Sequence, residues 1–324
     1  MCVLVCCSAG APQQTVRGST PWSGLEDTAD APALGVAQGA QRIESLQVLT
    51  HVSKLNTFGV TSTLIYGPTE AILVDAQFRN SEATALADQV AAKGKKLKAI
   101  FITEPDEDHY MGTAVLHQRF PNTPIYMTAD ALAHFQKVSP RQVAGAKIFL
   151  AGDAPDAVPT PEVLPHTHLL VDGRSVEIIP DSQGDVLDRT NSFVWVPALR
   201  TVIAGGIAFN HVHVYLGDST EESRQRWQDS IKRIQSLHPR VVIAGHKKST
   251  GLKDTSQVLI ATSEYLQAFD AARKSASDAK ALVDSMKQKY PDYGSEFVLV
   301  CSAAGSFNLT PEQIKQQFGP GPGC

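Results

Sequence analysis

A buried strand that runs straight into a loop crowded with acids constrains this chain more than any other feature of its sequence. The apolar residues 97–102 are expected to form the strand, and the loop carries four acids and a histidine within six positions: Glu104, Asp106, Glu107, Asp108 and His109. Acids packed so densely repel one another, so their pKa values rise unless a cation or hydrogen-bond donors neutralise them. An extended loop would place residues 104, 106 and 108 on one side, and a helix expected from about residue 109 to 119 would add His109 beside them. The pattern therefore predicts a metal site.

The order of the expected elements predicts an α/β fold. Strands and helices are expected in two similar series: 47–53, 60–66, 71–75, 80–93 and 97–102, then 175–180, 192–197, 201–205, 219–237 and 241–244. Two sheets with helices on their outer faces, a four-layer αββα sandwich, satisfy this order. We assign residues 46–250 to this domain, residues 1–45 to a loose N-terminal arm, and residues 251–324 to a mostly helical C-terminal extension packed on it.

Two long helical stretches are also expected. Residues 129–149 have helical composition but contain Ser139 and Pro140, and proline predicts an interruption there. Residues 254–289 are expected to be helical throughout.

The charge and hydropathy of the chain exclude several kinds of partner. The net charge is −4 and no run of Lys and Arg is present, so no nucleic-acid surface is expected. No apolar run approaches the roughly 18 residues that a membrane span needs. The C-terminal extension could mediate homodimerisation. Residues 1–11 resemble the apolar part of a secretory signal but lack a basic start, so the compartment stays open, with the cytoplasm favoured over secretion.

Four segments that are distant in sequence each end a strand with polar residues: 103–109, 181–189, 205–213 and 245–247. Loops at strand ends, held by a rigid scaffold, are where catalytic groups gather. His246 follows a buried strand and a glycine, and we interpret it as a ligand rather than a structural histidine. His211 and His213 alternate as in a strand, so both could face one side and contact metal or substrate, or lie on the surface.

The residue types at these strand ends suit a divalent cation. Two neutral imidazoles and one carboxylate, from His109, His246 and Asp108, with a position left for water, are typical of a catalytic zinc site. The same set suits the facial arrangement of non-haem Fe(II). Glu104 and Asp106 are harder oxygen ligands, so a further metal beside them would bind as Mn²⁺ or Mg²⁺, or not at all. In the alternative interpretation the loop is a solvated turn whose Asp106 or Asp108 caps the next helix.

Taken together, these segments resemble the metallo-β-lactamase-fold superfamily. The acidic loop occupies the place of the family's Thr-His-x-His-x-Asp-His signature. Residues 192–206, SFVWVPALRTVIAGG, resemble the family's paired late strands. Residues 241–249, VVIAGHKKS, resemble its closing strand with the Gly-His that follows. The resemblance covers about residues 46–250. It implies that Asp108, His109 and His246 hold a metal, and it favours His213 over His211 because the family often has Val-His near this point.

The chain departs from this family pattern at three places. Glu104 and Asp106 stand where the family usually has two histidines, and Gly206 stands where it usually has a bridging aspartate. The middle histidine is missing near residues 182–186, where Asp185, or Asp188 further along, could replace it. We therefore expect one firm metal position and one weaker position. Tyr110, directly after the ligand pair, could line the pocket or pack in the core.

The resemblance implies a metal-dependent hydrolase. Hydroxide bound to the metal would attack a carbonyl-type bond in a lactam, lactone, ester or thioester. The metal expected is zinc, with iron and manganese as alternatives. Asp106 or Glu104 would act as general base or as ligand of a second metal, and Asp108 would hold the first. A secondary metabolite or toxin is the kind of substrate expected. Two alternatives remain: a mononuclear iron oxidoreductase on the same fold, and a non-catalytic relative that has lost its metal.

Overall fold

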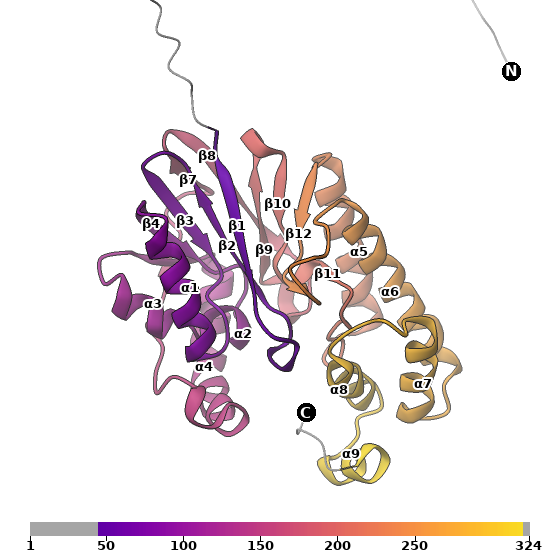
Figure 1. Ribbon diagram of the computed structural model, residues 1–324. Coiled ribbons are helices and arrows are strands. Elements are labelled where there is room, and N and C mark those ends of the chain that lie inside the picture. The colour runs from indigo at the N-terminus through magenta and orange to yellow at the C-terminus, as the bar shows by residue number, and fades with distance from the viewer. Residues whose placement is uncertain (1–44, 320–324) are drawn as a thin grey trace, which may run out of the picture. The chain divides into compact units, whose positions relative to one another are not determined.

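Two β-sheets packed face to face form the middle of the structure, a computed structural model that describes residues 45–319 (Figure 1). The predictions made for residues 1–11, and for the arm up to residue 44, lie outside this range. The first sheet has the order β1-β2-β3-β4-β5-β6. Its strands are β1 (Gln47–Val52), β2 (Thr61–Tyr66), β3 (Glu70–Val74), β4 (Lys96–Phe101), β5 (Ile125–Met127) and β6 (Glu162–Val163). The first three are antiparallel, and β3 to β6 are parallel.

The second sheet has the order β12-β10-β9-β8-β7. Its strands are β7 (His168–Val171), β8 (Arg174–Ser182), β9 (Asn191–Val196), β10 (Thr201–Ile203) and β12 (Val241–Ile243). A short parallel pair, β11 (Phe209–Asn210) and β13 (His246–Lys247), continues from the ends of β10 and β12. The strands expected from sequence around the acidic loop and before His246 are therefore present.

Alternation along the strands explains the layers. In β3, Ile72 and Val74 point into the core between the sheets, whereas Leu73 points to the helices outside. In β10, Ile203 points inward and Val202 outward. Because successive side chains of a strand face opposite sides, strands that are apolar at every position need cover on both faces. The four-layer αββα prediction is confirmed.

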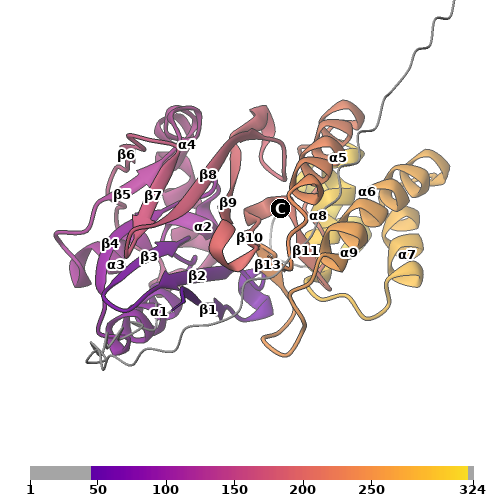
Figure 2. The same ribbon diagram turned by 90° about the horizontal axis from the view of Figure 1, so that it is seen from above.

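Helices supply that outer cover (Figures 1 and 2). On the first sheet these are α1 (Asn80–Ala92), α3 (Thr113–Arg119) and α4 (Ala129–Phe149), and the short α2 (Glu107–Tyr110) precedes α3. On the second sheet, α5 (Glu221–Ser236) and α6 (Gln257–Ser275) pack with α7 (Ala279–Lys289) and α8 (Glu296–Ser306), and α9 (Pro311–Phe318) follows. None of the helices in residues 45–319 combines the length and apolar character that crossing a membrane requires.

Two helix predictions are wrong. α4 continues through Pro140, because buried Leu132 and Phe135 before the proline and Ala146 after it anchor both halves of the helix. The stretch 254–289 is instead two helices. Ala276 is extended after α6, and the side chain of Asp278 accepts a hydrogen bond from the Ala281 amide to begin α7.

Candidate metal centre

The candidate centre lies where the loops after β4, β8, β10 and β12 meet. The extended conformation expected for the acidic segment is present only in part: the backbone is extended at Asp106, but Asp108 already lies in a helical turn. α2 begins at Glu107, and the Asp106 carboxylate accepts a hydrogen bond from the Glu107 amide at 3.0 Å. The capping role considered for Asp106 is therefore present. Asp108 and His109 follow in the first turn, and both are buried.

A tight contact between two loops brings His246 to the same place. Gly245 donates its amide to the carbonyl oxygens of Gly205 and Ala208, both at 3.0 Å. A Cβ atom at position 245 would lie 2.3 Å from the Gly205 carbonyl carbon, so only glycine fits. The His246 ring then stacks on Phe209, with 4.6 Å between ring centroids and 7° between planes.

Five ionisable side chains converge at this point. The Nε2 atoms of His109 and His246 lie 3.3 Å apart. Asp185 Oδ2 is 3.7 Å from His246 Nε2, and Asp108 Oδ2 is 3.9 Å from His246 Nδ1. Glu104 is the fifth, through its contact with His109. Asp108, His109 and His246 each offer one ligand atom, and these atoms lie within 4.8 Å of one another.

An oxygen atom lies beside the Nδ1 atom of each imidazole. Asp75 Oδ2 lies 3.1 Å from His109 Nδ1, and the Phe58 carbonyl oxygen lies 3.3 Å from His246 Nδ1. When both rings are neutral, a proton on each Nδ1 leaves the two Nε2 lone pairs free to hold a cation, the arrangement of histidine ligands backed by a carboxylate or carbonyl. Asp75 in turn accepts hydrogen bonds from the amide and hydroxyl of Thr103. Sequence reasoning did not select Asp75, although its place directly after a buried strand was a usable signal.

Glu104 is held by donors from two other loops. Its Oε1 accepts from the Gly206 amide at 2.8 Å, and its Oε2 accepts from the Asn191 side-chain amide. The same Oε1 lies 2.8 Å from His109 Nε2. Asn191 also donates to Asp185 Oδ1 at 3.1 Å, so one amide links two carboxylates. No pattern in the sequence pointed to Asn191.

Burial dominates the electrostatics of the cluster. Burial raises the pKa of Asp108 to about 8; His109 opposes this shift and the carboxylates of Asp106 and Glu104 add to it. Burial likewise raises the pKa of Asp185, and the charge of Glu104 raises it further. Burial and the charge of His109 lower the pKa of His246 to about 3, so this imidazole is neutral at pH 7. Burial alone would lower the pKa of His109, but Glu104, Asp75 and Asp108 together raise it well above its usual value.

These donors fit a divalent cation. The cluster contains two imidazoles and three buried carboxylates, those of Glu104, Asp108 and Asp185. Within residues 45–319, the ion pairs of these carboxylates are with His109 and His246. Buried carboxylates without enough positive charge are costly, and a cation removes that cost. Nitrogen and oxygen donors in this ratio suit zinc, iron or manganese.

The other residues selected from sequence are not among these five side chains, although the charge of Asp106 raises the pKa of Asp108 and of Asp185. Asp106 is half-buried at the start of α2. Tyr110 is fully buried, where its ring packs on Phe135 and its hydroxyl donates to Gln142. The prediction that His211 and His213 lie in a strand is wrong, although both rings lie near Tyr293, at centroid distances of 5.5 and 5.7 Å. β11 ends at Asn210, and His211 has a φ of 58° and is exposed, whereas His213 is buried against Tyr265.

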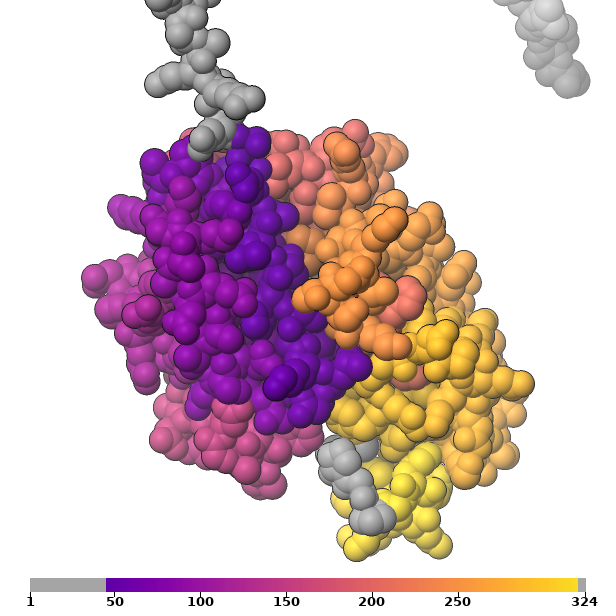
Figure 3. Space-filling view, in the orientation of Figure 1, coloured from indigo at the N-terminus to yellow at the C-terminus, as the bar shows by residue number. Residues whose placement is uncertain are grey.

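Four phenylalanines stack beside the centre. Phe58, whose carbonyl oxygen faces His246, has ring-centroid distances of 5.6 Å to Phe78, 5.9 Å to Phe149 and 5.3 Å to Phe297. Phe297 belongs to α8, so the C-terminal helices reach this side of the centre. Figure 3 shows the yellow C-terminal part meeting the indigo N-terminal part of the domain.

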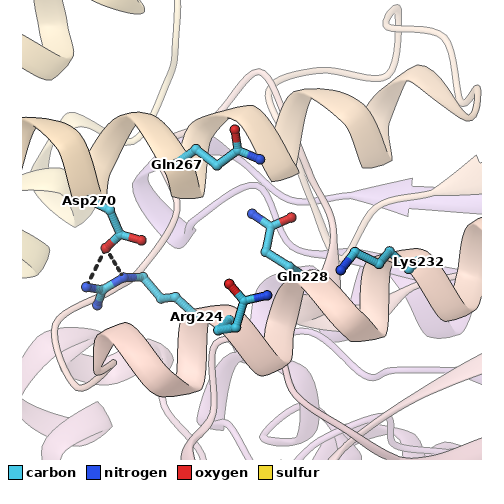
Figure 4. A pocket seen from close by; sticks show the side chains of 6 residues that line it. Arg224, Gln228, Lys232, Gln267 and Asp270 are labelled. Atoms are coloured by element: carbon cyan, nitrogen blue, oxygen red, sulfur yellow. Dashed lines mark hydrogen bonds and ion pairs between the residues drawn. The ribbon is translucent and has the colours of Figure 1, made fainter.

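A hollow of about 270 Å³ lies between α5 and α6 (Figure 4). Arg224 and Asp270 form an ion pair there at 2.6 Å, with Gln228, Lys232 and Gln267 beside them. None of these side chains belongs to the metal cluster, so we do not assign the chemistry to this hollow.

Comparison with known proteins identifies the family. The model of the metallo-beta-lactamase superfamily matches residues 55–246, and the chain belongs to this superfamily. The match ends at His246, the last member of the cluster. No curated protein matches the chain.

Solved structures show the same fold at low sequence identity. A metallo-beta-lactamase family protein from Thermus thermophilus is 18% identical with a TM-score of 0.57, and the match covers 81% of this chain and 91% of that protein. A metallo-beta-lactamase from Pontibacter korlensis is 17% identical with a TM-score of 0.52, over 69% and 95%. The DIM-1 metallo-beta-lactamase is 19% identical with a TM-score of 0.51, over 69% and 98%.

Proposed function

We propose that this protein is a metal-dependent hydrolase that cleaves a carbonyl-type bond of a small molecule. The observation that carries the proposal is the meeting of Asp108, His109 and His246 at distances suited to one cation. Family membership supports hydrolysis as the reaction class, while a lactam, lactone, ester or thioester each remains open as substrate.

The chain's own residues take distinct roles in this proposal. Asp108, His109 and His246 hold the cation, and Asp75 and the Phe58 carbonyl orient the two imidazoles. A bound divalent cation supplies Lewis-acid chemistry, which makes water more acidic and polarises a carbonyl oxygen. Glu104 Oε1, 2.8 Å from His109 Nε2, is placed to accept a proton from water beside that nitrogen. The stacked phenylalanines at Phe58 offer an apolar surface to an organic substrate.

One contact favours a second candidate function. A protonated His109 could pair with Glu104 without any cation, since Oε1 and Nε2 are only 2.8 Å apart. In that case the protein would be a non-catalytic relative in which Glu104 replaces the metal as the partner of His109.

Elemental analysis of the protein purified without a metal-binding tag tests both candidates. The hydrolase predicts about one zinc, manganese or iron atom per chain, together with turnover of at least one member of a panel of lactams, lactones, esters and thioesters. Iron with oxygen uptake and no hydrolysis would favour an oxidoreductase instead. Protein without metal, and without a rise in melting temperature when metals are added, would support the non-catalytic relative.

A further inference from the structure

The Asp185 carboxylate fills the space beside Gly206 in which any other residue would place its Cβ atom. A Cβ atom built on Gly206 would lie 2.1 Å from Asp185 Oδ1 and 2.3 Å from Oδ2. Gly206 has a φ of −67°, which every residue type adopts, so its backbone gives no reason for glycine. What requires glycine there is the carboxylate of Asp185.

Asp185 is also held firmly in that space. Its amide donates to the Gly206 carbonyl oxygen at 3.2 Å, and its Oδ1 accepts from Asn191 at 3.1 Å. The side chain is 3% exposed. Its second oxygen, Oδ2, is the one that lies 3.7 Å from His246 Nε2.

Two separations match those of neighbouring ligands on one cation. Zinc bonds of 2.0–2.2 Å in a tetrahedral arrangement put neighbouring donor atoms about 3.4 Å apart. The His109 and His246 Nε2 atoms are 3.3 Å apart, and Asp185 Oδ2 is 3.7 Å from the latter. Asp185 comes from the loop between β8 and β9, so it approaches from a segment that supplies none of the other three ligands.

We propose that Asp185 is a fourth ligand of the cation held by Asp108, His109 and His246, and that Gly206 is the positioning residue that admits it. This inference rests on the proposed metal centre. A side chain at position 206 would turn the Asp185 carboxylate away from the centre, because the end of a side chain moves more readily than backbone. Glycine at 206 and aspartate at 185 therefore act as a pair.

A double-mutant cycle on metal affinity tests the pair. Zn²⁺ affinity is measured by competition with a chromogenic chelator for the full chain, Asp185→Ala, Gly206→Ala and the double variant. Each single substitution is expected to weaken binding at least about 10-fold, since even residues behind metal ligands cost 10–100-fold. Adding Gly206→Ala to Asp185→Ala should change affinity by no more than about twofold, because the obstructed carboxylate is already gone.

A matched glycine provides the control. A Cβ atom on Gly152 would meet no atom within 4 Å, so Gly152→Ala should bind Zn²⁺ as the unaltered chain does. Melting temperatures in EDTA check that all variants are folded, a readout that needs no activity.

The outcomes separate the inference from the proposed function. Suppose that the unaltered chain binds Zn²⁺ and that either single variant binds it equally well. The inference about Asp185 and Gly206 is then refuted, while the centre formed by Asp108, His109 and His246 is retained. If Gly206→Ala weakens binding equally in the Asp185→Ala background, the link between the two residues is refuted. If the unaltered chain binds none of Zn²⁺, Mn²⁺ and Fe²⁺, both proposals fail.

Discussion

The Nε2 atoms of His109 and His246 lie 3.3 Å apart although 137 positions separate the two residues in the chain. Two imidazole nitrogens approach so closely when one donates a hydrogen bond to the other or when both face a shared cation. Asp75 and the Phe58 carbonyl lie beside the opposite nitrogens of the two rings, as they do for histidine ligands, and the proposed centre takes the second arrangement.

Removing the later imidazole tests that arrangement most directly. His246→Ala should weaken metal binding and hydrolysis by more than about 100-fold, beyond the range seen for residues behind a ligand. His238→Asn is the matched control, because His238 is exposed and its φ of 48° is tolerated by asparagine. Metal per chain and hydrolysis rate are measured for both, and equal losses would point to destabilisation instead of ligation.

Asp75 should act on the metal through His109. Asp75→Asn keeps the backbone φ of 63° accessible but removes the charge that faces His109 Nδ1. We expect metal affinity to fall about 10–100-fold, measured by chelator competition. An unchanged affinity would show that Asp75 serves only to hold the Thr103 amide and hydroxyl.

Substitutions can distinguish whether Glu104 or Asp106 is the proton acceptor. With a substrate found in the panel, Glu104→Gln should lower kcat about 10²–10⁴-fold with metal content kept, whereas Asp106→Asn should have little effect. The glutamine also leaves a buried donor from Asn191 or Gly206 poorly paired, at a cost of about 1–3 kcal/mol. Rates are therefore measured well below the melting temperature. Loss of metal in Glu104→Gln would instead make Glu104 a ligand.

His213 should make the fold sensitive to acid. Burial lowers the pKa of His213 to about 4, with Glu296 opposing the shift. The unfolded chain, with a histidine pKa of about 6.5, then binds the proton more readily. The stabilisation by neutral His213 is therefore complete above about pH 6.5 and is lost as the pH falls towards 4.

The size of this effect on the free energy of unfolding is about 3 kcal/mol, because each pKa unit corresponds to about 1.4 kcal/mol. Urea unfolding of the unaltered chain and of His213→Gln at about pH 7.5 and pH 4 gives the difference due to this residue. The gap between the two proteins should narrow in acid, and a gap that stays constant would show that His213 does not titrate in this range.

The layers of the fold could be predicted because they follow from local pattern. Apolar strands such as β3 and β4 are separated by turn residues and need other elements packed on both of their faces. This requirement can be recognised from the sequence of each strand alone. The continuous α4 and the break between α6 and α7 could not be predicted. Burial of Leu132, Phe135 and Ala146 outweighs the cost of Pro140, and only the packed structure shows that burial.

The sequence by itself determined the αββα architecture and selected Asp108, His109 and His246. These residues lie in the segments that follow the buried strands β4 and β12, and such strands can be recognised from the local pattern of apolar residues. The tertiary structure decided their surroundings: that Asp75 backs His109, that Asn191 joins Glu104 to Asp185, and that Asp185 fills the space left by Gly206. The physical reason is that these contacts depend on where separate loops come to rest. A few ångströms in loop position decide whether a carboxylate reaches the centre, and no spacing along the chain encodes that distance.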